Sequence, residues 1–170
     1  EEGRFVFENV NPGTQTLIID QRSIGVKDLT DRKMPIEIVV NPDLTTHIEI
    51  GMVRAGAISG QVSVKQIRRM VQSSNEDFSL PRCIIEVSND DEKYMTQTDG
   101  QGNYLFSTLR PGKWTVRIIP TYWKNKFKIT KESFEITVEP SEKNEVNFAL
   151  TPKFRQIRFK TNKTIKVGGK

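Results

Sequence analysis

Cysteine and histidine are almost absent from this sequence. Of its 170 residues, only Cys83 and His47 are of these two types. A single cysteine excludes a disulfide within the chain, and a zinc site built from Cys and His needs more ligands than these two. A cysteine nucleophile needs a nearby base, and His47 lies in a separate apolar segment. We therefore predict that Cys83, which opens the apolar stretch 83–87, is a buried thiol.

Long hydrophobic runs are missing as well. No stretch approaches the roughly 20 apolar residues that a membrane-spanning helix needs. No amphipathic helix of useful length is visible, and the best candidate, residues 65–72, reads equally well as a continuing strand. Hydrophobic residues make up 35% and charged residues 28% of the chain, which is typical of a polar globular protein with one medium or two small domains.

Acidic residues are missing from the C-terminal segment. Residues 153–170 carry a charge of +7 and include Arg155, Arg158 and Lys160, so the net charge of +5 leaves −2 for the rest of the chain. Because the basic character is confined to this tail, the composition argues against a nucleic-acid partner for the body. Alternation of Ile157 and Phe159 with basic residues predicts a strand-like tail, with an anionic surface as an alternative partner.

Alternating apolar and polar residues dominate what is present. Pro- and Gly-containing turn sequences, such as 11–13 and 110–112, separate the alternating segments. One apolar and one polar face is what a sheet needs when it packs on a core on one side only. The sequence predicts an all-β protein of the sandwich or barrel type, with these inward-facing sets: Phe5/Phe7, Leu17/Ile19, Ile36/Ile38/Val40, Ile48/Ile50/Met52, Ile85/Val87, Tyr104/Phe106, Trp114/Val116/Ile118, Phe134/Ile136/Val138 and Val146/Phe148/Leu150.

The chain also contains the same pattern twice. The series Gly-x-aromatic-x-Phe-x-x-aliphatic-x-Pro-Gly begins at Gly3 and again at Gly102, a shift of 99, and the later matches from Val40 onward have a shift of 98. Predicted strands at 57–64 and 83–88 precede the second motif, whereas only two glutamates precede the first. We therefore expect the first copy to be half a module whose opening strands lie upstream in a longer protein.

A half module leaves apolar side chains that need a second layer. We expect upstream strands, another chain or the basic tail to cover them. The side chains concerned are Phe5, Phe7, Ile38, Val40, Ile48 and Ile50.

Residues 56–62, 98–106 and 109–114 carry a family resemblance. Together they resemble the carboxypeptidase-regulatory-like family, which groups with transthyretin-like and collagen-adhesin B-type repeats, although Trp114 replaces the customary tyrosine. The resemblance implies Greek-key β-sandwich modules of the prealbumin or Ig-like type in tandem. The implied division is 1–56 as the C-terminal half of one module, 57–152 as a complete module, and 153–170 as the basic tail.

The same resemblance implies an exported bacterial protein, at the cell surface or in the periplasm. No catalytic constellation is visible, so we predict no enzyme activity, cofactor or metal. The predicted role is a structural spacer and interaction module of a surface or outer-membrane-associated protein, with adhesion, glycan or protein partners and neighbouring modules as contacts. Short linkers such as 53–56 would set its reach. An accessory domain of a secreted enzyme is an alternative.

One loop is the candidate binding site. Residues 120–128 combine aromatic and basic side chains outside any clear alternation, so they could stack on a sugar or anchor a partner. Alternatively, the aromatic rings fold back and cap the core. The candidate residues are Tyr122, Trp123, Lys124, Lys126 and Phe127.

Two turns and one residue pair could have a functional role, but an ordinary structural role is favoured for each. The segment 99–103 resembles a calcium loop faintly, but its single acid favours a plain hairpin turn, and 89–92 is predicted to be a solvated acidic loop. An isopeptide bond between Lys65 and Asn147 would need a buried acid such as Glu86. Asn147 lies between two apolar residues, which predicts that it points outward.

Overall fold

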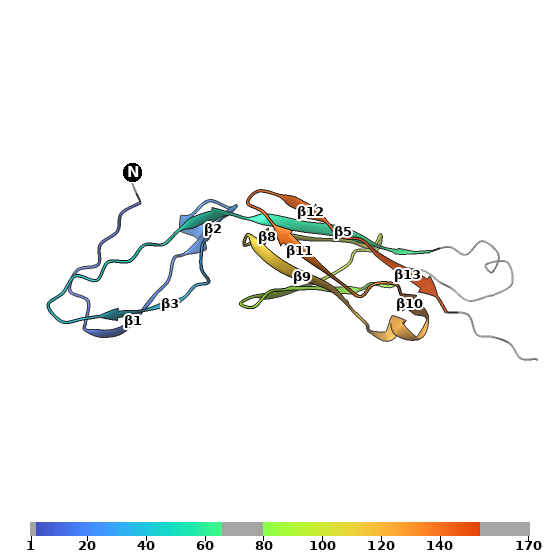
Figure 1. Cartoon of the computed structure of the whole chain (residues 1–170), viewed down its shortest axis with the longest axis horizontal. Coiled ribbons are helices and arrows are strands. Elements are labelled where there is room, and N and C mark those ends of the chain that lie inside the picture. The colour runs from blue at the N-terminus through green and yellow to red at the C-terminus, as the bar shows by residue number, and fades with distance from the viewer. Residues whose placement is uncertain (1–2, 66–79, 154–170) are drawn as a thin grey trace, which may run out of the picture.

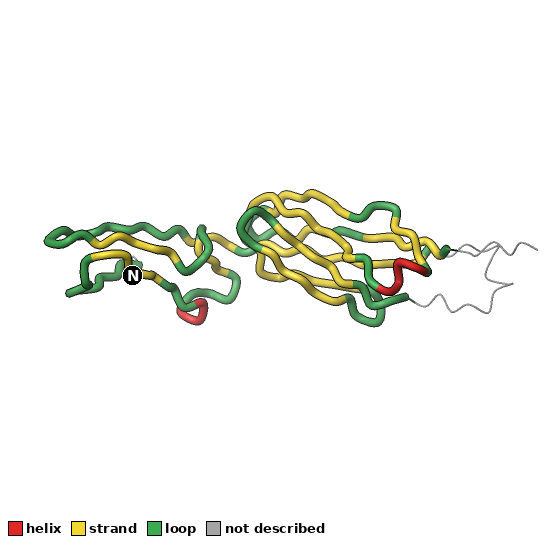
Figure 2. The backbone as a smooth tube through the Cα atoms, turned by 90° about the horizontal axis from the view of Figure 1, so that it is seen from below, coloured by secondary structure: helices red, strands yellow, loops and turns green. Residues whose placement is uncertain are grey.

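The computed structural model describes residues 3–65 and 80–153. The described chain forms two bodies that follow one another along the long axis of the molecule (Figures 1 and 2). We call residues 3–54 the N-terminal unit and residues 56–153 the sandwich. No helix in the described residues has the length and apolar character needed to cross a membrane.

One sheet of the sandwich is centred on β5 (Gly56–Val64). β8 (Asn103–Leu109) pairs with it antiparallel, and β12 (Lys143–Glu145) and β13 (Phe148–Pro152) pair with it parallel. β10 (Phe127–Ile129) adds to the far side of β13. β5 is therefore the central strand of this sheet, with β8 along one edge and β12 and β13 along the other.

The second sheet has the strand order β11-β9-β6-β7, with every pair antiparallel. Its strands are β11 (Ser133–Val138), β9 (Gly112–Ile119), β6 (Ile84–Ser88) and β7 (Lys93–Gln97). The two sheets bury one core between them, which confirms the predicted all-β sandwich. Its most deeply buried residues include Ile58, Val62, Ile85, Val87, Trp114, Val116, Ile118, Val138, Phe148 and Leu150.

The N-terminal unit contains two short antiparallel pairs. β1 (Gly13–Leu17) pairs with β3 (Ile36–Val40), and β2 (Asp28–Thr30) pairs with β4 (Met52–Arg54). A 3-10 turn, η1 (Gln21–Ser23), connects β1 to β2, as η2 (Tyr122–Asn125) connects β9 to β10.

The strand registers reproduce the sequence repeat. Gly13 pairs with Val40 as Gly112 pairs with Val138, and the β1–β3 register then follows the β9–β11 register residue by residue. The β2–β4 pair likewise repeats β10–β13, because 28 pairs with 54 as 127 pairs with 152. The N-terminal unit therefore has counterparts of one edge strand and its neighbour from each sheet of the sandwich: β1 and β3 correspond to β9 and β11, and β2 and β4 correspond to β10 and β13.

The backbone turns repeat as well. Positive φ angles occur at Gly3 and Gly102 (59° and 85°) and at Gly13 and Gly112 (116° and 140°). Asp43 and Ser141, at 58° and 64°, form a third equivalent pair in a conformation that is uncommon for residues with a side chain. These angles recur together with the repeated sequence motif and the repeated strand registers.

Two predicted strands are wrong. Residues around Phe5 and Phe7 and around Ile48 and Ile50 have no strand assignment, whereas their counterparts in the second copy lie in or beside β8 and β13. In the sandwich these segments pair with β5, and the described N-terminal unit contains no strand equivalent to β5. A segment without a ladder partner has no hydrogen-bond pattern that makes it a strand.

Candidate functional site

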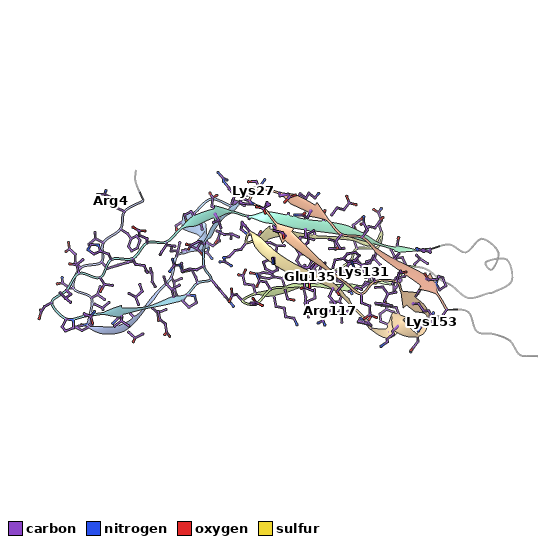
Figure 3. All side chains as sticks on the ribbon, in the orientation of Figure 1. Arg4, Lys27, Arg117, Lys131, Glu135 and Lys153 are labelled. Carbon is purple, nitrogen blue, oxygen red and sulfur yellow. The ribbon has the colours of Figure 1, made fainter. Side chains whose placement is uncertain are left out.

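The junction between the two bodies is where the described chain brings polar groups together. The connection itself is a single residue, Ala55, between β4 and β5, and it is 7% exposed. Its backbone N–H donates to the carbonyl of Lys27, which is labelled beside this junction in Figure 3, at 2.7 Å. Asp28 and Arg54, which face each other across β2 and β4, form an ion pair at 3.0 Å. The predicted linker at 53–56 is therefore extended and hydrogen-bonded.

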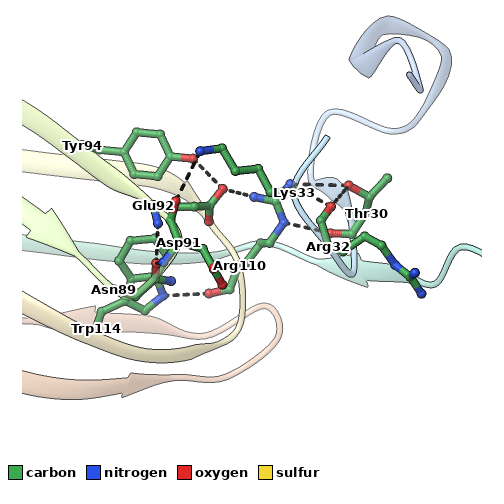
Figure 4. A network of polar contacts seen from close by, with 9 residues as sticks. All are labelled: Thr30, Arg32, Lys33, Asn89, Asp91, Glu92, Tyr94, Arg110 and Trp114. Atoms are coloured by element: carbon green, nitrogen blue, oxygen red, sulfur yellow. Dashed lines mark hydrogen bonds and ion pairs between the residues drawn. The ribbon is translucent and has the colours of Figure 1, made fainter. Parts of the chain in front are cut away.

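Arg110 reaches across this junction from the β8–β9 turn of the sandwich (Figure 4). Its Nε donates to the carbonyl of Thr30 at 2.9 Å, and its Nη2 lies 3.4 Å from both the Thr30 hydroxyl and the Arg32 carbonyl. Its Nη1 pairs with the Glu92 carboxylate. One guanidinium thus binds both bodies, and its planar set of donors suits this arrangement.

The sandwich holds Glu92 and Arg110 in place. The Glu92 carboxylate is 4% exposed and also accepts a hydrogen bond from the Tyr94 hydroxyl at 3.0 Å. The Tyr94 ring packs on Trp114 with centroids 6.0 Å apart, and the Trp114 indole donates to the Arg110 carbonyl at 2.8 Å. Burial, with the adjacent Glu92 carboxylate as a further cause, raises the pKa of Tyr94 above its usual value.

A second contact crosses the junction beside the first. Lys33 donates through Nζ to the Asp91 carbonyl at 3.2 Å. The turn that presents this carbonyl is held by Asn89, whose side-chain oxygen accepts from the backbone N–H groups of Asp91 and Glu92. These residues border a hollow of about 360 Å³. The arrangement orients the two bodies relative to each other.

Sequence reasoning missed this site. Arg110 stands at the variable position before Pro-Gly in the repeat motif, and the first copy has Asn11 there. The difference between the copies is a signal that could have been used. The role of Arg110 cannot be read from this difference alone, because its acceptors at Thr30 and Arg32 in the N-terminal unit are backbone carbonyls, which have no sequence signature.

Two of the three aromatic residues in the predicted binding loop are buried. Trp123 and Phe127 are 1% and 3% exposed and belong to the core cluster, so neither can offer its ring face to a ligand in this structure. They cap the core, which was the stated alternative. Tyr122 is 73% exposed, and Lys124 and Lys126 are exposed too.

A small pocket lies beside this loop, in the part of the chain that the structure describes. Its volume is about 220 Å³, and its lining includes Trp123, Phe127 and Lys153. The indole N–H of Trp123 and the hydroxyl of Thr121 are buried without a hydrogen-bond partner among the described residues. Buried polar groups usually have hydrogen-bond partners, so a ligand in this pocket could accept a hydrogen bond from the Trp123 indole.

The other candidate residues have ordinary structural roles. Burial raises the pKa of Cys83 to about 11, so the thiol is protonated at neutral pH, and the prediction of a buried thiol is confirmed. Asp99 accepts hydrogen bonds from the backbone N–H groups of Gln101 and Asn103, as in a plain turn. Asn147 is exposed and accepts from the Gln61 N–H at 2.7 Å.

Two further predictions concern metal ligands and the basic tail. Within residues 3–65 and 80–153, no group of three or more His, Cys, Asp or Glu residues is placed to hold a metal ion. Arg155, Arg158 and Lys160 lie outside the described residues.

Two of the solved structures that resemble this chain are proteins of Gram-positive bacteria. The Bacillus anthracis TIE protein is 15% identical with a TM-score of 0.44, and the match covers 70% of this chain and 20% of that one. GBS52, the minor pilin of the Gram-positive pathogen Streptococcus agalactiae, is 13% identical with a TM-score of 0.46, and the match covers 91% of this chain and 66% of that one.

These similarities are too weak to decide function. Both TM-scores are below 0.5, so the fold assignment above rests on the strand pairing of the chain itself. The chain spans about a fifth of the TIE protein. No family model and no curated protein matches the sequence. Membership of the carboxypeptidase-regulatory-like family therefore stays a prediction.

Proposed function

We propose that this chain is a structural spacer of an exported bacterial surface protein, in which the Arg110 contacts set the angle between successive modules. The observation that supports this most directly is the single guanidinium bound by the Glu92 carboxylate on one side and by the Thr30 and Arg32 carbonyls on the other.

Physical chemistry favours a rigid junction here. The Arg110 side chain is 19% exposed and that of Glu92 is 4% exposed, so solvent screens this pair less than a surface pair. Hydrogen bonds to a charged group are about twice as strong as neutral ones. The one-residue connection at Ala55 leaves little length for independent movement. A spacer needs both properties, because its reach depends on a fixed orientation.

The division into modules at 1–56, 57–152 and 153–170, the family and the export of the protein belong to the same proposal. The repeated registers support two related modules. Surface partners, whether protein or glycan, remain part of what we propose.

The test measures the relative orientation of the two bodies. We expect Arg110→Ala to give two independent alignment tensors in residual dipolar coupling experiments and a broader size distribution in small-angle scattering, whereas the unsubstituted chain gives one tensor. Arg117→Ala is the matched control, since Arg117 pairs with Glu86 within the sandwich and touches no residue of the N-terminal unit among its described partners.

A double variant distinguishes loss of the Arg110 contacts from misfolding of the sandwich. Arg110→Ala leaves the Glu92 carboxylate buried without its cation, which costs about 3–5 kcal/mol in comparable pairs. Arg110→Ala combined with Glu92→Gln removes that charge and should still uncouple the two bodies. If this double variant keeps a single alignment tensor, the Arg110 contacts do not set the angle.

Binding at the 120–128 loop is a second candidate function. The Trp123 N–H, which has no hydrogen-bond partner among the described residues and belongs to a side chain that lines the pocket, favours it together with the exposed Tyr122 ring. Tyr122→Ala should abolish binding on a glycan array without changing the unfolding temperature. Met95→Ala removes a side chain of similar exposure on β7 and should leave binding intact. Equal binding by both variants would exclude the loop.

A further inference from the structure

The pocket beside the 120–128 loop has a size and a lining that point to one class of ligand. It lies at the end of the sandwich that points away from the N-terminal unit, beside η2 and β10 (Figure 1). Its volume is about 220 Å³, and its lining comes from the segment 120–132 and Lys153. Drug-sized ligands usually occupy pockets of about 300–1,000 Å³. This pocket, which we call the loop pocket, therefore suits one small unit of a ligand.

Positive charge dominates the lining of the loop pocket. Lys124, Lys128 and Lys153 line it together with a single acid, Glu132, so three positive charges stand against one negative charge. In the described parts of the chain, none of these three lysines forms an ion pair. Their charges are thus available to an anionic ligand.

Lys153 is held in position by two hydrogen bonds (Figure 3). Its backbone N–H donates to the Lys126 carbonyl at 2.7 Å, and its Nζ donates to the Lys124 carbonyl at 2.7 Å. An ammonium group has three hydrogens to donate, so two remain for a ligand. Because this ammonium group is already oriented, binding an anion costs less conformational entropy than it would at a free lysine.

The indole N–H of Trp123 is a second donor that needs an acceptor. Trp123 lines the loop pocket, is 1% exposed, and has no hydrogen-bond partner for its N–H among the described residues. A buried donor without a partner costs free energy that an acceptor on a ligand would recover. The exposed side chains of Lys124 and Lys128 change rotamer within nanoseconds, so they can move aside for such an acceptor.

The remaining lining residues narrow the class of ligand. Pro120 and Ile129 supply apolar surface, and the Glu132 carboxylate accepts hydrogen bonds from a ligand. A matching ligand therefore carries an anionic acceptor, hydroxyl donors and a small apolar face. A bare phosphate or sulfate ion has no such face, and an acidic peptide would extend beyond a pocket of this size.

We propose that the loop pocket binds an acidic sugar residue of a glycan, a saccharide with a carboxylate such as a hexuronate or a sialic acid. The carboxylate accepts hydrogen bonds from the Lys153 ammonium and the Trp123 indole, a hydroxyl donates to Glu132, and the C–H face of the ring packs on Pro120 and Ile129. This inference rests on the second candidate function, binding at the 120–128 loop, and specifies its ligand.

The test follows the indole N–H signals of the full chain by NMR during titration with sodium glucuronate and, separately, with N-acetylneuraminate. Glucose is the neutral control, and acetate is the control for charge alone. We expect the Trp123 signal to shift saturably with at least one acidic sugar, with a Kd at least about tenfold lower than for either control. Trp114 is the internal reference, because its N–H already donates to the Arg110 carbonyl at 2.8 Å.

Substitutions assign the binding to this pocket. Lys153→Met removes the oriented charge, keeps an apolar stem, and should raise the Kd of the acidic sugar at least about tenfold, because a charge-assisted hydrogen bond is lost. Lys113→Met, at the start of β9 and outside the lining, is the matched control and should leave the Kd unchanged. If Lys153→Met does not fold, Lys128→Met removes an exposed charge of the same lining and should also raise the Kd.

Four results would overturn the proposal. Equal binding of glucose would show that charge does not select the ligand, and equal binding of acetate would show a general anion site. Tighter binding of an aspartate-rich peptide would make the occupant a protein. A Trp123 signal that none of the compounds shifts would mean that the pocket is not a site.

The glycan array separates this inference from the function on which it rests. Neutral glycans that bind the unsubstituted chain and not Tyr122→Ala would support binding at the loop and contradict an acidic ligand. A Trp123 signal that responds to an acidic sugar while Tyr122→Ala binds the array normally would support the loop pocket and exclude the Tyr122 ring.

Discussion

Gly60 shows how one residue can decide the geometry of a layer. It lies in β5 where β8 crosses on one side and the segment before β13 approaches on the other. The Val146 carbonyl beside it accepts a hydrogen bond from the buried Tyr104 hydroxyl at 2.5 Å. Only a residue without Cβ allows this approach, so glycine is required here by contact and not by backbone angle.

We predict that Gly60→Ala destabilises the sandwich by about 1–3 kcal/mol or more, because the added methyl group overlaps backbone that cannot move away freely. Chemical denaturation followed by tryptophan fluorescence measures this, since Trp114 and Trp123 are both buried in the sandwich.

Gly100→Ala is the matched control. A Cβ atom at Gly100 meets nothing within 4 Å, and the φ of Gly100 is not in the left-handed region. The free energy of unfolding should therefore change by only about a few tenths of a kcal/mol. Equal effects of the two substitutions would mean that the close approach at Gly60 does not matter.

At the scale of elements, an ion-pair cluster ties together three strands of the second sheet. Glu86 of β6 binds Lys93 of β7 and Arg117 of β9, each with a nitrogen–oxygen distance of 2.7 Å. The Glu86 side chain is 4% exposed although it lies on the polar face predicted for this sheet. The hydrogen bonds from Lys93 and Arg117 outweigh the opposing effect of burial and hold the pKa of Glu86 below its usual value of 4.5.

This lowered pKa predicts how stability depends on pH. A carboxyl whose pKa is lower in the folded than in the unfolded state stabilises the fold above its ordinary pKa, and this contribution is lost as the pH falls through the folded-state value. We therefore expect the free energy of unfolding to decrease as the pH falls below about 4.5. Glu86→Gln should flatten this part of the curve in denaturant titrations at a series of pH values. An unchanged slope in the variant would assign the acid sensitivity to other carboxyls.

At the scale of the whole molecule, the two bodies differ in how deeply the described residues bury their apolar side chains. The sandwich has two full layers and a closed core, whereas the N-terminal unit has two two-stranded sheets and half-buried apolar side chains such as Ile38 and Ile50. The free energy of local unfolding should therefore be higher in the sandwich than in the N-terminal unit.

We predict that amides of β1 and β3 exchange with solvent at least about tenfold faster than those of β6 and β9 in the isolated chain. Hydrogen exchange followed by NMR or mass spectrometry measures both sets in one experiment. The β6 and β9 amides act as the internal reference, because their side chains Val87 and Val116 are fully buried. Similar rates would show that the N-terminal unit is as stable as the sandwich.

Local sequence patterns were sufficient to predict the class of fold and the repeat. Period-2 alternation in 114–118 and 134–138 predicted β9 and β11, and the Pro-Gly turns predicted where strands reverse. These features are decided within a few residues, which is why the positive φ angles at Gly13 and Gly112 agree although their surroundings differ. The same local reading was wrong for Phe5 and Phe7, because an alternating segment becomes a strand only when a neighbour pairs with it.

The sequence by itself therefore determined the all-β character, the turns and the duplicated register of the two bodies. Only the tertiary structure decided that Trp123 and Phe127 cap the core and that Arg110 joins the bodies. The physical reason is distance along the chain: Arg110 and Thr30 are 80 residues apart, and their contact depends on packing that no short pattern encodes.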